Sequence, residues 1–271
     1  MLVHMQDALT SGMAGSAAMA VQVSSLMWLR TTVNYQYTVG GGTRQALQAL
    51  YRHGGIRRFY RGFPVALVQA PLTRFGDVVS YAATRDLGLP HWQATALGAL
   101  GSAAWKLALM PLDTLKTSLQ VHGSTTALVR KVRSAGPSTL FHGYLGTAGA
   151  TMLGYYPWFF TYGALDRQLP PHDGSHASTL LRNAALGFGA SAVSDTVSNA
   201  ARVIKVCRQT HDTSLSYAAA AQRVIQQDGL SGLLSRGLRT KLLANGIQGA
   251  TFSVAWRYLE QRWAPRSDVE Q

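Results

Sequence analysis

Apolar residues along this chain are gathered into long runs, which short polar and basic connections separate. One run covers residues 97–110, and others cover residues 63–81, 144–162 and 238–256. A helix needs about 20 mostly apolar residues to cross the hydrocarbon core of a bilayer. The pattern therefore predicts a polytopic membrane protein whose long helices are joined by short loops.

A short amphipathic stretch and a glycine-containing motif come before each of the last three runs. Apolar or aromatic residues stand four and eight positions before the first glycine of each motif: Tyr51 and Leu47, Val132 and Leu128, Ile225 and Ala221. Residues at this spacing share one face of a helix. Each unit is therefore predicted to consist of a membrane helix, a short surface helix and a second membrane helix.

The chain contains this unit three times. The copies align on Ser25, Pro111 and Ala200, and each anchor is preceded by a glycine at thirteen positions and a serine at nine. These small residues are Gly12 and Ser16, Gly98 and Ser102, and Gly187 and Ser191. Small residues four positions apart let membrane helices approach closely. We expect an all-α membrane protein with six transmembrane helices, in repeats at residues 10–90, 91–175 and 180–262.

The distribution of charged residues predicts how the helices are oriented across the membrane. The 271-residue chain has 25 Lys and Arg against 12 Asp and Glu, and 17 of these bases lie in the connections inside the repeats. Basic residues prefer the loops that stay on the inner side of a membrane. Six spans then place both termini on the opposite side. Because the bases flank apolar runs, the charge does not favour nucleic-acid binding.

Residues 111–120 end the preceding apolar run with a proline and two opposite charges. Pro111 lacks a backbone N–H and is expected to kink its helix, and Asp113 and Lys116 then share a helical face. Together with Gln120, this spacing resembles the signature of the mitochondrial carrier family.

The glycine motifs carry the same resemblance. Residues 53–62, 136–143 and 228–237 are variants of the family's element, in which an acidic residue and glycine are followed by an aromatic residue, a base and glycine. The resemblance covers residues 10–262. It implies a three-fold pseudosymmetric barrel of six tilted helices in the inner mitochondrial membrane, with basic loops in the matrix and both termini on the intermembrane-space side. Any targeting information is expected to be internal.

The resemblance also implies a matrix gate, in which an acid of each signature pairs with a base of the next. Met27, Asp113 and Arg202 stand at the acid positions here. The candidate gate residues are Arg30, Asp113, Lys116, Gln120, Arg202 and Lys205. Since one acid faces four bases, at most one or two of the expected pairs can form.

A second, cytoplasmic gate is implied near the ends of the even-numbered helices. The aromatic residue of that motif is kept in every repeat, as Tyr81, Tyr162 and Trp256, but the acid after it is lost. Charged residues that could form a rearranged set are Arg85, Asp166, Arg257 and Glu260.

The candidate substrate site lies at mid-depth in the cavity that the resemblance implies. Its residues are Gln69, Thr151 and Asn245, together with the charged Arg74, Lys106 and Asp195. Charges inside a membrane span indicate function. Lys106 and Asp195 could hold a zwitterion such as an amino acid, or could instead pair with each other and fix two helices.

The glycines that open the second helix of each repeat offer free backbone N–H groups, which favour phosphate. In the carrier family such positions hold cardiolipin. The candidates are Gly55, Arg61, Gly62, Gly143, Arg236 and Gly237, and plain helix capping is the alternative. No catalytic constellation, metal-ligand set or cofactor motif is evident, so we expect neither an enzyme nor a cofactor.

Two functions remain open. The first is transport of a small metabolite by alternating access. The second is a transport-inactive accessory subunit of a respiratory-chain or ATP synthase assembly, since both gates depart from the family pattern.

Overall fold

The protein is described by a computed structural model over residues 2–85, 90–170 and 176–248. Its elements are α1 (Leu2–Val39), α2 (Thr43–Arg52), α3 (Gly55–Phe59), α4 (Phe63–Arg85), α5 (His91–Ala108), α6 (Met110–His122), α7 (Thr126–Ala135), the 3₁₀-helix η1 (Pro137–Phe141), α8 (Tyr144–Gln168), α9 (His176–Thr210) and α10 (Tyr217–Ser235). A further helix covers residues 238–248. The expected all-α class is confirmed for these residues.

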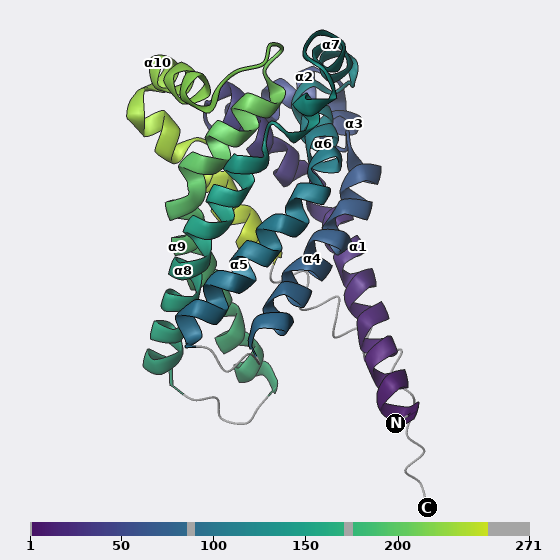
Figure 1. Ribbon diagram of the computed structural model, residues 1–271, viewed down its shortest axis with the longest axis vertical. Helices are drawn as coiled ribbons and strands as arrows, with labels where there is room; N and C mark the ends of the chain where they lie inside the picture. Colours follow the sequence, from purple (N-terminus) through teal and green to yellow (C-terminus); the bar gives the residue numbers. More distant parts are fainter. Residues whose placement is uncertain (1, 86–89, 171–175, 249–271) are drawn as a thin grey trace, which may run out of the picture.

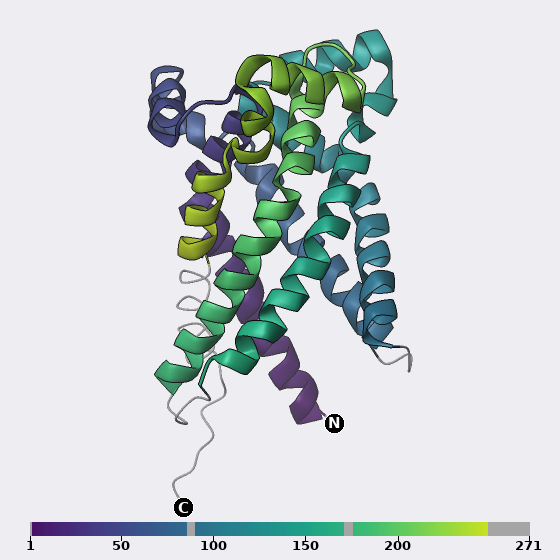
Figure 2. The same ribbon diagram turned by 90° about the vertical axis from the view of Figure 1, so that its left-hand side faces the viewer.

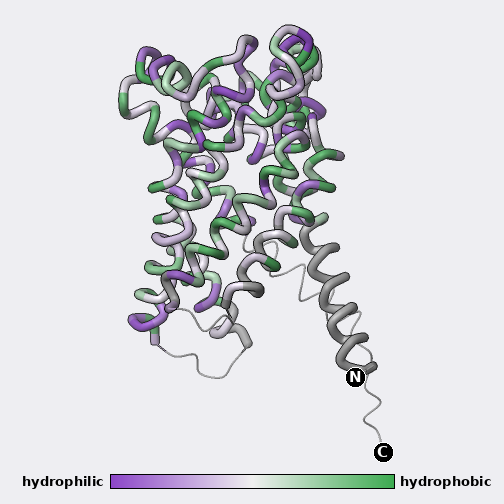
Figure 3. Tube along the Cα trace, in the orientation of Figure 1, coloured by the Kyte–Doolittle hydropathy of each residue, from purple (hydrophilic) through white to green (hydrophobic). Residues whose placement is uncertain are grey.

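The long helices run side by side along the molecule, and the short helices gather at one end (Figures 1 and 2). We call this the short-helix end; it carries α2, α3, α7 and α10, and the start of α1 lies at the opposite end. Hydrophilic positions are frequent at the short-helix end (Figure 3). Across the described ranges, no helix combines the length and apolar character needed to cross a membrane. The six transmembrane helices therefore stay a prediction.

The break between α5 and α6 confirms the kink expected at Pro111. Leu109 separates the two helices, and Pro111 stands in the first turn of α6. Proline fits this position because the first turn of a helix leaves its N–H groups unbonded anyway. The anchors of the other copies, Ser25 and Ala200, keep their N–H groups, and α1 and α9 run through them without a break.

The surface helices form where the pattern predicts them, but two of them turn a different face inward. In α2 the buried residues are Ala46 and Leu50, whereas Tyr51 is 59% exposed. In α10 they include Ala220 and Val224, one position before the predicted pair. A shift of one position rotates the inward face by about 100°, and the rotation brings these residues against the long helices.

The core beneath the short-helix end joins all three repeats. Val33 and Tyr37 from α1, Val121 from α6 and a group from α9 and α10 form one buried cluster. The remaining members of the cluster are Val203, Val206, Cys207, Ala220 and Val224.

The last glycine of each motif sits where one repeat touches the next. A Cβ on Gly62 would lie 3.2 Å from Leu119 of α6, and one on Gly237 would lie 2.9 Å from the ring of Tyr37 in α1. A Cβ on Gly143 would collide with the side chain of Gln209 in α9. The three repeats thus close on one another in a cycle, and glycine is required at the joints because the backbones approach closely.

Candidate functional site

Asp113 binds side chains from three helices. Its carboxylate forms ion pairs with Lys116 at 3.0 Å and with Lys205 of α9 at 2.7 Å. It also accepts hydrogen bonds from Gln69 of α4 at 3.0 Å and from Gln209 at 3.2 Å. The pair with Lys205 is the link between the second and third repeats that the carrier signature leads us to expect.

A neutral contact takes the place of an ion pair between the first and second repeats. Met27, which stands where an acid is expected, is fully buried, and its sulfur accepts a weak hydrogen bond from Gln120 at 3.6 Å. The other end of the Gln120 amide accepts a bond of 2.6 Å from Asn34. Asn34 stands where the other two repeats carry Gln120 and Gln209, so these amides link the helices without charge.

Arg202, at the acid position of the third repeat, turns back along its own helix. Its guanidinium lies 3.0 Å from the carboxylate of Asp195, seven residues earlier in α9, and donates to Ser198 between them. Asn245 of helix 238–248 donates a second bond to Asp195. Asp195 is 6% exposed, whereas the side chain of Arg202 keeps 31% of its surface exposed.

The candidate substrate residues therefore separate into two groups. Lys106 of α5 donates to the hydroxyl of Thr151 in α8 at 3.5 Å, while Asp195 is held by Arg202 and Asn245. Among the described side chains no ion pair joins Lys106 to Asp195. Gln69 lies against Asp113, nearer the gate than mid-depth. The side chain of Arg74 lies outside the described part of the structure.

Of the residues predicted for the cytoplasmic gate, only Asp166 has a side chain within the described part of the structure. Asp166 of α8 forms an ion pair of 2.7 Å with Arg182 of α9. The same guanidinium donates to the main-chain oxygens of Asp166 and Pro170. The side chain of Arg85, and all of Arg257 and Glu260, lie outside the described residues. Sequence reasoning missed Arg182, which belongs to no recognised motif.

Sequence reasoning also did not predict that buried bases at the short-helix end act together. Arg58 donates to the carbonyls of Gln120 and Val121 at the end of α6, at 2.8 and 2.5 Å. Lys131 donates to the carbonyls of Arg208 and Gln209 at the end of α9, at 2.8 and 3.2 Å.

Arg236 completes the set by donating to the carbonyl of Thr38 at the end of α1, at 3.2 Å. We call these three bases, Arg58, Lys131 and Arg236, the carbonyl clamp. Each caps a long helix of the next repeat, where unpaired carbonyls and the helix dipole favour a cation. The sequence placed all three among the basic connections and singled out Arg236 alone, as a lipid candidate.

Burial lowers the pKa of Lys131, the member of the carbonyl clamp that lies in α7. Removal of the Lys131 ammonium from water, with Arg208 nearby, lowers the pKa of Lys131 to about 8. His142, near the same two bases, has its pKa lowered for the same reasons, burial first.

The lipid candidates differ in what their side chains and backbone contact. Arg236 is bound internally, to Asp228 at 2.8 Å and to Thr38, and its side chain is 2% exposed. Arg61 is exposed, and Gly55 opens the short helix α3 with a φ of +61°. Gly62, Gly143 and Gly237 are the joint glycines described above.

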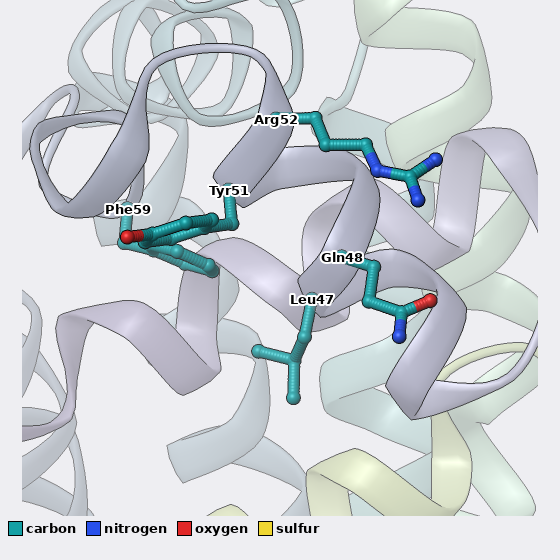
Figure 4. A pocket seen from close by; sticks show the side chains of 5 residues that line it. All are labelled: Leu47, Gln48, Tyr51, Arg52 and Phe59. Atoms are coloured by element: carbon teal, nitrogen blue, oxygen red, sulfur yellow. The ribbon is translucent and has the colours of Figure 1, made fainter.

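A surface pocket of about 360 Å³ lies between α2 and α3 (Figure 4). Leu47, Gln48, Tyr51, Arg52 and Phe59 line it. In this view the rings of Tyr51 and Phe59 overlap on one side of the pocket, and the polar ends of Gln48 and Arg52 point the same way on the other.

Comparison with known proteins gives a family. Residues 3–89 and 87–173 each match the family described as Mitochondrial carrier protein. The two matched stretches correspond to the first two repeats. No match to a curated protein is found.

Proposed function

Because the chain belongs to the mitochondrial carrier family, we propose that it carries a small metabolite across the inner mitochondrial membrane by alternating access. Family membership implies the inner mitochondrial membrane and a carrier-type transporter rather than an enzyme. Our orientation has the short-helix end in the matrix and both termini in the intermembrane space.

The observation that carries this proposal is the ion pair of 2.7 Å between Asp113 and Lys205. It joins two repeats at the short-helix end, where a carrier must close and reopen its matrix side. The joint between the first and second repeats uses the neutral contacts of Met27 and Asn34 with Gln120. Opening this end therefore requires breaking the Asp113–Lys205 ion pair and the bonds that the carbonyl clamp makes between repeats.

The candidate substrate contacts are the two groups already described. Lys106 and Thr151 offer a cation and a hydroxyl, and Asp195 and Asn245 offer a carboxylate and an amide. A zwitterion would bind its carboxylate at Lys106, and its ammonium would have to compete with Arg202 for Asp195. Gln69 and Arg74 complete the proposed lining.

Uptake of radiolabelled amino acids into liposomes tests this function. We expect Lys106→Ala to reduce uptake at least tenfold, because a charge-assisted contact is worth about 1.5–3 kcal/mol. Arg57→Ala removes an exposed base of α3 and is the matched control, with uptake expected to stay unchanged. Equal uptake by Lys106→Ala and the wild type would remove Lys106 from the substrate site.

The second candidate is a transport-inactive accessory subunit of a respiratory-chain or ATP synthase assembly. The observation that favours it is the replacement of a gate acid by the buried Met27. Native gels of gently solubilised mitochondria decide between the two. Migration as a free chain favours the carrier, and stoichiometric migration with a respiratory or ATP synthase complex favours the subunit.

Cardiolipin is the proposed lipid partner in either case. Gly55, Arg61 and Gly62 support it because they combine free helix-start N–H groups with an exposed base. The equivalent proposed positions in the other repeats are Gly143, Arg236 and Gly237, and because the side chain of Arg236 is buried against Asp228 and Thr38, the lipid would meet the backbone there. Retention of cardiolipin by the purified protein, and its loss in Arg61→Ala, would be the measurement.

A further inference from the structure

Positive charge is in excess where the three repeats meet. Five bases lie there, which we call the basic cluster: Arg30 of α1, Lys116 of α6, Arg202 and Lys205 of α9, and Lys241 of helix 238–248. Lys241 lies within electrostatic range of four charged side chains: Asp195, Arg202, Arg30 and Lys116. Lys116 lies within range of Asp113, Lys205 and Arg30. Asp113 and Asp195 are the acids among these neighbours, so the bases exceed the acids by three.

Both of these acids are already engaged. Asp113 receives two ammonium groups and two amides, which occupy the acceptor positions of a carboxylate. Asp195 receives the guanidinium of Arg202 and the amide of Asn245. Neither carboxylate forms an ion pair with Arg30 or Lys241.

The side chains of Arg30 and Lys241 form no ion pair and no hydrogen bond with any described side chain or carbonyl. Both are half-buried. Their helices lie in contact, because Ala244 packs on Leu29, and Gln22 donates to the carbonyl of Gln248 at 3.0 Å. Arg30 follows Leu29 directly, and Lys241 lies one turn before Ala244. A guanidinium and an ammonium thus keep their N–H donors unused at one joint.

Crowded like charges, partly withdrawn from water, raise the energy of the closed arrangement unless a counter-charge is present. A group that supplies it needs several oxygen acceptors and at least two negative charges, because the excess is three. Phosphate and carboxylate oxygens meet guanidinium and ammonium donors with short, charge-assisted bonds. A monovalent anion would leave most of the excess in place.

We propose that the basic cluster binds a compact multivalent oxyanion, which takes the place of the gate acids absent at Met27 and Arg202. Arg30 and Lys241 are its direct ligands, and Lys116, Lys205 and Arg202 supply the surrounding positive field. The ligand completes the closed gate. This deepens the proposed function by naming a ligand class for the gate, yet binding is measurable without transport.

The oxyanion could be a soluble metabolite or the headgroup of an anionic lipid, and the experiment separates these sources. Thermal unfolding of the detergent-purified chain is measured with pyrophosphate, with tricarballylate, with cardiolipin, and with sodium chloride at matched ionic strength. A soluble ligand at a hundredfold excess over its Kd should raise the Tm by about 5 °C. Chloride should raise it far less.

Two variants test the ligands. Lys241→Gln and Arg30→Gln should each weaken binding about tenfold, because each removes a charge-assisted contact. Without ligand their Tm should equal or exceed that of the wild type, because each relieves repulsion, and this shows that they fold. Arg57→Gln, an exposed base of α3, is the matched control and should bind as the wild type does.

The outcomes are distinct. A shift by a soluble anion that both variants lose supports a metabolite, and a shift by cardiolipin alone that both lose supports a lipid headgroup. An equal shift by chloride, or a shift that both variants keep, means an adventitious charge effect only and overturns the proposal. No shift by any of the oxyanions overturns it as well. Amino-acid uptake without oxyanion binding removes this inference alone, and oxyanion binding without uptake removes the transport proposal alone.

Discussion

The carboxylate of Asp113 joins three helices through four contacts, and this makes it a sensitive point in the interior. Removing one partner of a buried ion pair costs more than the pair contributes, because the other charge is left without compensation. Lys116 and Lys205 would both be left in this state. The effect of a substitution here is therefore dominated by the partners that remain.

We expect Asp113→Asn to lower the free energy of unfolding by about 3 kcal/mol. The double variant Asp113→Asn with Lys205→Met should recover part of that loss, because one stranded ammonium is removed. Asp212→Asn, at an exposed position, is the control. Chemical unfolding of the purified variants measures all of these. Additive losses in the double variant would show that Asp113 and Lys205 are not coupled.

The lowered pKa of Lys131 makes the free energy of unfolding depend on pH, and the direction of the shift fixes the sign. Its folded pKa of about 8 lies below the usual 10.5 of a lysine, so the unfolded chain binds this proton more tightly. Stability linked to Lys131 is lowest below pH 8 and rises as the pH increases from 8 toward 10.5.

We therefore expect the wild type to gain about 2 kcal/mol relative to Lys131→Met between pH 8 and pH 10. Thermal unfolding of both proteins at several pH values measures the difference, and the variant cancels the contribution of other titrating groups. Parallel pH profiles would mean that the ammonium of Lys131 is not withdrawn from water in the folded protein.

At the scale of elements, the joints between repeats depend on glycine for close approach. Gly237 has a φ of +66° and would place a Cβ against Tyr37 of α1. Both the backbone conformation and the contact disfavour a side chain. Gly149, inside α8, has neither constraint, because an added Cβ there meets nothing within 4 Å.

Gly237→Ala should thus destabilise the protein by about 2 kcal/mol. Gly149→Ala should leave stability unchanged or raise it by about 0.5–1 kcal/mol, because alanine favours a helix interior. The two Tm values measured side by side test the joint directly. A similar small effect of both substitutions would remove close packing as the reason for Gly237.

At the scale of the whole molecule, the short-helix end is closed by two different devices. The carbonyl clamp passes from Arg58 to α6, from Lys131 to α9 and from Arg236 to α1, so each repeat holds the next. The second device is the ion pair between Asp113 of α6 and Lys205 of α9. The clamp joins surface segments to helix ends through main-chain carbonyls, so the repeats stay linked where the family's ion pairs are missing.

The sequence by itself determined the helical elements, the period of the repeats, the kink at Pro111 and the bias of basic charge toward one set of connections. These follow from local properties: the spacing of apolar residues, the missing N–H of proline and the identity of each side chain. Asp113 and its pairing with Lys205 were also predictable, because the signature motif carries both residues.

Only the tertiary structure decided which base meets which acceptor. Arg202 reaches Asp195, Lys106 reaches Thr151, and Lys131 reaches carbonyls of α9 rather than an acid. A long flexible side chain has several partners in range, and the choice depends on how the helices are rotated and how closely they approach. The one-position rotation of α2 and α10 has the same origin, since the inward face is set by the helices against which these elements pack.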